Sequence, residues 1–245
     1  MKQWTVPAVL AIASAMPAAA AEWGVGLGAL YAPNPYRDTD PTRMVIPVIN
    51  YEGEKFYLRG IKGGYRFIND RQQTLEAFVV GYSARFDPDD SGDLRLLDER
   101  KFAVMGGLGY SRNYEWGSLG AEAAYDISGH SDGTVVELSY SYPFFGENRR
   151  WILTPQLGLT WFDDTYVDYY AGVSAAESAR SGIDAYDGKS TVNPYVALVG
   201  MYNFTPNWRL GAFFRGGWQG DGFADSPMMQ RTFVPSGFVA LTYQF

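Results

Sequence analysis

Apolar and polar residues alternate along much of this chain, in segments of roughly ten residues that are separated by turn-forming residues. In residues 151–161 every second residue is apolar, and those between them are mostly small or polar. Residues 208–218 repeat the pattern and place Arg209 and Arg215 on the second face. Because the side chains of a strand point alternately to its two faces, each segment predicts a β-strand with one apolar face. The pattern therefore predicts an all-β protein.

Two of these segments carry tryptophans ten positions apart on the apolar face, Trp151 with Trp161 and Trp208 with Trp218. Ten residues at about 3.3 Å each, tilted by about 40°, rise roughly 25 Å. This rise matches the apolar band of an outer-membrane barrel, which is roughly 25 Å tall and bordered by aromatic girdles. A soluble β-sandwich has no reason to repeat this spacing. We therefore expect a closed antiparallel transmembrane β-barrel, since closure leaves no strand edge open to lipid.

The last strand ends in an aromatic residue at the C-terminus itself. Val239, Leu241, Tyr243 and Phe245 fall on one face, and small or polar residues fall on the other. A terminal aromatic strand of this kind is typical of bacterial outer-membrane barrels, in which the assembly machinery recognises it. These four residues are therefore the expected assembly signal, and the barrel assembly machinery is an expected partner.

The connections between the strands alternate in length. Short turns are typical of the periplasmic side of such a barrel, and longer loops of the extracellular side. An odd number of strands must then fit between a short turn and a long loop, so we expect three between residues 52–54 and 87–99. The total is about 12 strands, or ten if residues 55–69 form one bent strand. The expected short turns are 52–54, 115–117, 146–148 and 205–207, the longer loops 33–42, 87–99, 164–190 and 220–231, and the three strands 55–60, 63–69 and 73–86.

The first 21 residues have the features of a secretory signal peptide. Lys2 supplies a positive charge, residues 6–16 are largely apolar, and Ala19 to Ala21 form a small-residue cleavage site before Glu22. The apolar run is too short to span a bilayer, which needs about 20 residues. We expect export, cleavage of residues 1–21, and a single barrel domain over residues 22–245.

Composition narrows the range of functions. The chain has no cysteine, which excludes disulfides and cysteine nucleophiles. Its formal net charge of −7 makes nucleic acid an unexpected partner. Aromatic residues make up 16% of the chain, a composition that suits membrane interfaces. We expect the cell outer membrane as the location, with outer-membrane lipid and lipopolysaccharide as surroundings.

Several charged residues fall on the faces that would line the lumen. They are Glu122, Asp126, Glu137, Arg209 and Arg215. Such residues can form the selectivity region of a channel. They can equally pair across a closed, filled lumen, with loop 164–190 as a gate or a plug. The sequence leaves both alternatives open.

His130 is the only histidine, and Ser128, Ser131 and Asp132 lie beside it. Catalysis needs a nucleophile, a base and an orienting group in a preset arrangement, which neighbours on one turn rarely form. The residues favour a structural turn histidine. Acidic residues in the loops, such as Asp87 and Asp89, do not match a calcium loop and favour solvated charge. We predict no catalytic residue, cofactor or metal site.

Three stretches resemble the MipA/OmpV family of outer-membrane proteins. His130 lies in a turn that resembles the family's Gly-His-Gly-Gly turn. Residues 166–182 are similar to its Tyr-x-x-x-Tyr-Phe-Gly-Val and Ala-x-x-Ser-Gly stretch, although Ala171 stands where the family usually has Phe. Residues 224–227 resemble its Ala-Asp-Ser-Pro loop. The family-motif residues are His130, Tyr166, Tyr170, Gly172, Val173, Ser181, Gly182, Ser226 and Pro227.

This resemblance implies a role as well as a fold. The MipA side of the family is described as an interaction partner of a murein lytic transglycosylase and a penicillin-binding protein, and the OmpV side as pore, adhesin and immunogen. We therefore expect a non-enzymatic scaffold or interaction protein linked to murein synthesis and turnover. A small-solute channel or adhesin is the alternative, and a lipid hydrolase is a third hypothesis.

Overall fold

The alternating segments fold into long strands, with short helices between some of them. The computed structural model describes residues 22–82 and 85–245, so the expected signal peptide, residues 1–21, lies outside the described residues. None of the helices in the described ranges is long and apolar enough to cross a membrane. The strands are β1 (Glu22–Ala32), β2 (Thr42–Glu52), β3 (Phe56–Arg59), β4 (Lys62–Asn69), β5 (Gln73–Tyr82), β6 (Ala103–Tyr114), β7 (Gly117–Asp126), β8 (Thr134–Ser141), β9 (Phe144–Phe145), β10 (Trp151–Phe162), β11 (Thr191–Asn203), β12 (Trp208–Trp218) and β13 (Phe233–Gln244). The helices are η1 (Pro88–Asp90), η2 (Glu147–Arg149), α1 (Asp164–Ala171), α2 (Ala175–Ser181) and α3 (Asp221–Ala224).

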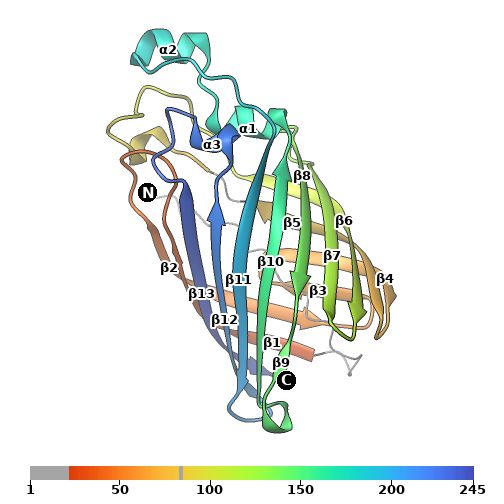
Figure 1. Ribbon diagram of the computed structural model, residues 1–245. Helices are drawn as coiled ribbons and strands as arrows, with labels where there is room; N and C mark the ends of the chain where they lie inside the picture. Colours follow the sequence, from red (N-terminus) through yellow and green to blue (C-terminus); the bar gives the residue numbers. More distant parts are fainter. Residues whose placement is uncertain (1–21, 83–84) are drawn as a thin grey trace.

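The strands close into an antiparallel barrel (Figure 1). Strand β13 pairs with β1, and β10 pairs with β11, so the ring is complete. The short β9 pairs with β10, as β8 does, and so continues β8; the thirteen segments make twelve barrel strands. Residues 56–69 form two strands joined at Gly60 and Ile61. The prediction of twelve strands is confirmed, and the single bent strand is wrong.

The two faces of the wall differ as the alternation predicts. Along β10 the outward Leu157 is 56% exposed, whereas the inward Thr160 is 2% exposed. Trp151 and Trp161 point outward from the same strand, and Trp208 and Trp218 do so from β12. The outer surface is thus apolar and aromatic, as a wall in contact with lipid must be.

The C-terminal strand closes the ring against the first strand. Residues Gly24 to Tyr31 of β1 pair with Gln244 to Gly237 of β13. A Cβ on Gly26 would collide with the Leu241 carbonyl oxygen, so only glycine permits this close approach. Phe245 is 70% exposed, and its ring packs on Tyr243 at a centroid distance of 5.2 Å. Its role as an assembly signal stays a prediction.

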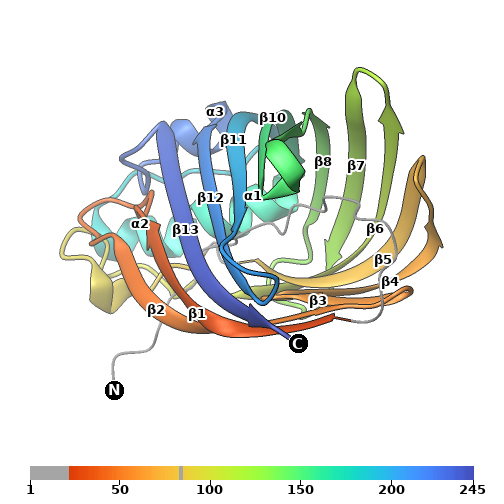
Figure 2. The ribbon, with the colours of Figure 1, turned by 90° about the horizontal axis from the view of Figure 1, so that it is seen from below.

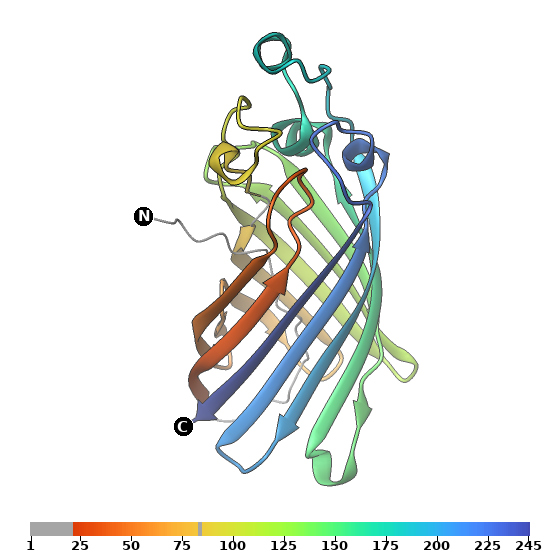
Figure 3. The same ribbon diagram turned by 90° about the vertical axis from the view of Figure 1, so that its left-hand side faces the viewer.

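The two ends of the barrel are built differently (Figures 1 and 3). One end, the turn end, has short connections and carries the C-terminus. The other, the loop end, has the longer connections and helices α1 to α3. The β3–β4 hairpin does not reach the loop end, because β3 has only four residues before the chain turns at Gly60 and Ile61. Among the described strands, residues 42–48 of β2 therefore pair with β1 alone.

The longer connections fold together into a cap over the loop end. Seen from the turn end, α1 lies within the ring of strands (Figure 2). Its Tyr166 and Tyr170 pack with Tyr82 and Met105 of the wall and with Phe223 of α3. A second buried cluster joins the remaining loops through Tyr36, Phe86, Leu94, Leu97, Val173 and Met228. We use "cap" below for residues 33–41, 85–102, 163–190 and 219–232.

Candidate functional site

The first of two polar groups in the middle of the lumen centres on Lys62 of β4, which is 1% exposed. Its Nζ lies 2.7 Å from Glu122 Oε1 and 3.5 Å from Glu76 Oε1. The Tyr57 hydroxyl donates to the same Glu76 oxygen at 2.8 Å. The ammonium also lies 4.0 Å from the centre of the Phe78 ring. A lysine in this dry position is stable only because two carboxylates and an aromatic face surround it.

The second group centres on Arg215 of β12. Its Nη1 lies 3.2 Å from Glu137 Oε2, and its Nη2 donates to Thr160 Oγ1 at 2.9 Å. The guanidinium carbon lies 3.6 Å from the centre of the Tyr195 ring. The Tyr195 hydroxyl donates to Glu137 Oε1 at 2.8 Å. The pair is therefore hydrogen-bonded on several sides, which offsets the cost of placing charge in the barrel.

These two groups meet at a cavity of only about 10 Å³. A single water needs about 10–15 Å³, so this cavity holds at most about one water molecule. The lining residues are Lys62, Phe78, Val80, Tyr82, Glu122, Ala124, Val135 and Glu137.

The structure brings three of the five predicted lumen charges to this level, namely Glu122, Glu137 and Arg215. The other two lie elsewhere. Arg209 lies toward the turn end and donates from Nε to Asn203 Oδ1 at 3.0 Å. Asp126 ends β7 and binds the turn that follows it.

Sequence reasoning missed Lys62 and Glu76. The glycines at 60, 63 and 64 indicated a break in the strand. Lys62, Gly64 and Arg66 nevertheless alternate on one face of β4. That alternation was the available signal. Glu76 lay in a segment in which both faces are apolar, so no pattern set it apart.

The turn around His130 is organised by Asp126. This carboxylate accepts hydrogen bonds from the backbone N–H groups and hydroxyls of Ser128 and Ser131 and from the His130 N–H. His130 Nδ1 lies 2.8 Å from the Phe102 carbonyl oxygen, which can only accept, so Nδ1 carries the proton. It cannot then take a proton from the Ser128 hydroxyl, which donates to Asp126. Ser128 and His130 Nδ1 therefore do not form the nucleophile–base pair that a serine hydrolase needs.

Helix α1 fills the mouth of the barrel with family-motif residues. Its N-terminus is capped by Asp163, which accepts a hydrogen bond from the Tyr166 N–H at 2.8 Å. The ring of Tyr166 stacks on Phe162 at 5.0 Å. The Tyr170 hydroxyl donates to the Lys101 carbonyl oxygen at 2.9 Å, and Tyr36 donates to the Tyr170 carbonyl oxygen at the same distance. Loop 164–190 thus contains two short helices, and α1 packs against the inner wall of the barrel.

The other family-motif residues join loops that are distant in sequence. The Ser226 hydroxyl donates to the Ala171 carbonyl oxygen at 2.6 Å, and Arg37 Nη1 donates to the Pro227 carbonyl oxygen at 3.2 Å. Val173 forms an isolated β-bridge with Tyr186. Gly172 O accepts from Arg100, the Ser181 hydroxyl donates to the Glu177 carbonyl oxygen, and Gly182 ends α2 at φ +75°.

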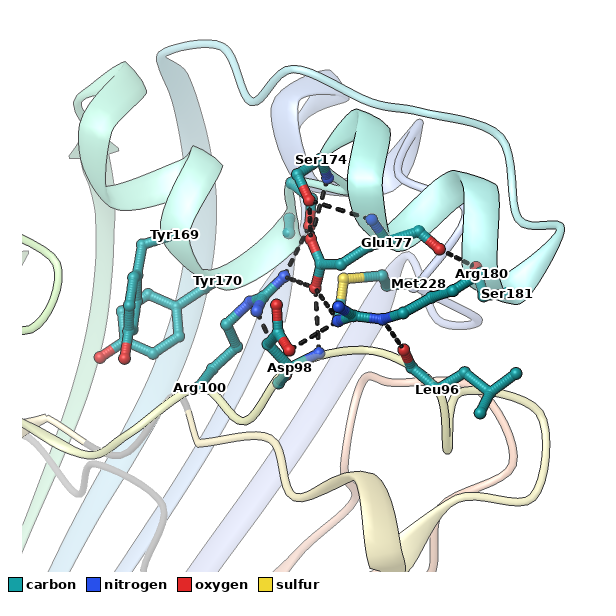
Figure 4. A network of polar contacts seen from close by, with 12 residues as sticks. Leu96, Asp98, Arg100, Tyr169, Tyr170, Ser174, Glu177, Arg180, Ser181 and Met228 are labelled. Carbon is teal, nitrogen blue, oxygen red and sulfur yellow. Dashed lines mark hydrogen bonds and ion pairs between the residues drawn. The ribbon is translucent and has the colours of Figure 1, made fainter.

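The carboxylate of Glu177 ties α2 to the loop between β5 and β6 (Figure 4). Its Oε1 accepts from Arg100 Nη2 at 2.8 Å and from the Asp98 N–H at 3.0 Å. Its Oε2 accepts from the N–H and hydroxyl of Ser174, which completes a capping box. Glu177 is 3% exposed, whereas the neighbouring Arg180–Asp98 pair is open to solvent. We call the Glu177–Arg100 contact the latch.

The latch carboxylate has a strongly lowered pKa. Burial acts to raise the pKa of Glu177, but hydrogen bonds from Asp98, Ser174 and Arg100 outweigh it and lower the pKa from 4.5 to about 2. Because the pKa of Glu177 in the folded protein lies below its ordinary value of 4.5, the ionised carboxylate stabilises the cap fully at a pH above 4.5. This stabilisation is lost as the pH falls toward 2 and the carboxylate takes up a proton.

We expect pepsin to cleave loop 164–190 slowly at pH 4 and progressively faster toward pH 2. Because the activity of pepsin itself depends on pH, each rate is divided by the rate at which pepsin cleaves a denatured substrate at the same pH. In Glu177→Gln the carboxylate is absent, so cleavage at pH 4 should already be fast and should not rise further after the same correction. Equal pH profiles for the two proteins would contradict the role given to Glu177.

Several acidic loop residues cap helices or bind other residues of the loops. Asp87 caps η1 and pairs with Arg85 at 2.6 Å, Asp163 caps α1, and Asp168 accepts from the Gly188 N–H. Within residues 22–82 and 85–245, no three His, Cys, Asp or Glu side chains are grouped as a metal site would require.

Comparison with known proteins links this chain to outer-membrane proteins. A family model described as "MltA-interacting protein MipA" matches residues 25–245. The MltA-interacting protein of Escherichia coli (strain K12) is 32% identical over 247 residues, which cover 100% of this chain and 99% of that protein. The putative outer membrane protein YiaT of the same strain is 33% identical over 228 residues, 92% of each chain. Outer membrane protein OmpV of Vibrio cholerae is 22% identical over 193 residues, covering 77% of this chain and 73% of OmpV.

Among solved structures, an outer membrane channel from Pseudomonas putida F1 has a TM-score of 0.48 at 14% identity, over 94% of this chain and 96% of the channel. The CymD monoaromatic hydrocarbon channel has a TM-score of 0.42 at 10% identity, over 93% of this chain and 88% of that chain.

Proposed function

The chain belongs to the MltA-interacting protein MipA family, and on that premise we propose that it anchors a murein lytic transglycosylase to the periplasmic face of the outer membrane. Its relatives are named as outer membrane proteins, and it is itself an outer-membrane β-barrel. With short turns on the periplasmic side and longer loops outside, the turn end faces the periplasm. A penicillin-binding protein is the second partner that we propose, from the family resemblance.

The observation that supports this proposal is that side chains and α1 occupy the inside of the barrel at two levels. The Lys62 and Arg215 groups form ion pairs inside the barrel, and the tyrosines of α1 pack against wall residues at the loop end. A barrel filled in this way is suited to holding a partner at a fixed place. It is poorly suited to passing solutes.

The backbone of the connection between β9 and β10 projects at the turn end (Figure 1). It includes η2, and its Arg149 and Arg150 are exposed. Asn148 and Arg149 both have positive φ, at 52° and 54°, so the turn holds an unusual backbone shape. We propose that an acidic surface of the transglycosylase binds these arginines.

The test is a pull-down from detergent-solubilised envelopes, with the protein as bait and mass spectrometry as readout. Wild-type protein should recover a lytic transglycosylase, and the Arg149→Glu, Arg150→Glu double variant should recover several-fold less at low salt. Arg231→Glu, which changes an exposed arginine at the loop end, is the matched control. Failure of the wild-type bait to recover any murein enzyme would overturn the proposal.

A small-solute channel is the second candidate, favoured by the charged lumen residues. Its test is planar-bilayer recording of wild-type protein and of a variant in which a short linker replaces residues 164–190. The linker is feasible because Phe162 and Thr191 are paired across β10 and β11. Steady conductance by wild-type protein would support the channel, and its absence from both proteins would exclude it.

A further inference from the structure

An open groove of about 480 Å³ lies at the turn end, away from the lumen and the cap. It is formed where the β4–β5 turn meets the hairpin of β6 and β7. Its lining residues are Arg71, Gln72, Arg112, Asn113, Tyr114 and Glu115. None of the functions considered above uses it.

Two arginines in this groove are exposed and available. Neither Arg71 nor Arg112 forms an ion pair with another of the described residues. The Arg112 guanidinium carbon lies 5.5 Å from the centre of the Tyr114 ring, which orients it. The groove therefore presents two guanidinium groups that are available to bind an anion.

The backbone beneath the arginines is held in place by Asn113. Its N–H donates to the Gln72 carbonyl oxygen at 2.7 Å, and its Nδ2 donates to the Arg71 carbonyl oxygen at 3.0 Å. Asp70 accepts from the N–H groups of Gln72 and Gln73, which fixes the turn on its other side. Arg71 is thereby held beside Arg112 by the fold itself.

The groove opens at the level of the lipid headgroups. Arg112 shares the outward face of β6 with Leu108, which is 58% exposed, and with Tyr114. The Tyr114 ring stacks on Trp116 at 4.8 Å, and Trp116 stacks on Tyr140 at 5.9 Å. Such a band of aromatic rings marks the boundary between the apolar core of the bilayer and its headgroups.

We propose that this groove binds the headgroup of a phospholipid in the periplasmic leaflet, with its phosphate held between Arg71 and Arg112. Guanidinium groups form paired, charge-assisted hydrogen bonds to phosphate oxygens. The carboxylate of Glu115 lines the same groove and provides a partner for an amine. Two arginines and one glutamate thus complement phosphoethanolamine, which carries one phosphate and one ammonium group.

The test is a titration of delipidated protein in detergent with phosphatidylethanolamine, followed by native mass spectrometry. Arg71→Ala and Arg112→Ala should each weaken binding about tenfold, the loss expected for one hydrogen bond to a charged group. Arg43→Ala is the matched control: Arg43 is exposed and lies 5.8 Å from the Tyr31 ring at the other end of the barrel. It should bind as wild type does.

Two further arms identify the ligand. Glu115→Gln should weaken binding of phosphatidylethanolamine while leaving that of phosphatidylglycerol, which has no amine, unchanged. Glycerophosphoethanolamine, which has no acyl chains, should bind much more weakly than the lipid; equal binding would show a site for soluble phosphate and overturn the proposal. Equal lipid binding by wild type, Arg71→Ala and Arg112→Ala would also overturn it. The heat-dependent shift in gel mobility confirms that each variant is folded.

Discussion

Lys62→Met is expected to lower the free energy of unfolding of the barrel by about 3–5 kcal/mol, the usual cost of removing one partner from a buried ion pair. The substitution keeps an unbranched, largely apolar side chain and removes the charge and the hydrogen-bond donors of the ammonium group. Glu76 and Glu122 would then face each other in the lumen without a cation. Glu76 is the more affected of the two, because its Oε2 is already buried without a hydrogen-bond partner.

The measurement is urea unfolding of the protein in detergent micelles, followed by tryptophan fluorescence. Lys55→Met is the matched control, because Lys55 is exposed at the turn end and its loss should cost less than about 0.5 kcal/mol. Adding Glu122→Gln to Lys62→Met removes one of the unpaired carboxylates and should recover part of the loss. Equal stabilities of Lys62→Met and Lys55→Met would show that the lumen pair contributes nothing.

Arg100→Ala is expected to release the cap while leaving the barrel wall intact. Arg100 is 7% exposed and binds both Glu177 and the Gly172 carbonyl oxygen, so its removal leaves the buried Glu177 carboxylate with only the more distant Arg180, 3.9 Å away, as a cation. The cost to the closed cap should again be about 3–5 kcal/mol, which raises the population of the open cap by at least about a hundredfold.

Trypsin cleavage under native conditions measures this opening, because Arg180 and Lys189 lie in the same loop as α1. Cleavage at these two residues should accelerate by about a hundredfold in Arg100→Ala. Arg231→Ala, an exposed arginine in another part of the cap, should leave the rate unchanged. The latch would be ruled out as the main restraint if both variants were cleaved at the wild-type rate.

The sequence predicted the wall of the barrel well because the wall follows a local rule. Alternation with period two marks the outward rows of Trp151 and Trp208 without knowledge of any other strand. The number of strands followed from the lengths of the connections. Both depend on residues close together in the chain.

The lumen and the cap depend on distant residues, which a local rule cannot join. Glu137 and Arg215 lie 78 positions apart, and β10 and β11 separate their strands in the sheet. They meet only because the barrel curves back on itself. Likewise, the Tyr and Gly residues of 166–182 indicated an ordered loop, but nothing in them specified that Tyr170 would contact Tyr36 and Lys101.

The cap also sets an order of events during assembly. Its hydrogen bonds join residues very far apart in the chain: Tyr36 with Tyr170 across 134 positions, and Tyr36 with Gln230 across 194. Contacts between residues this far apart form late, because closing so long a loop costs chain entropy. Pairing between neighbouring strands shortens the loop and lowers this cost first. The first and last connections come together only when β13 reaches β1. A nascent barrel therefore passes through a stage in which its cap is not yet assembled, and the pairing of β13 with β1 also brings the two ends of the cap together.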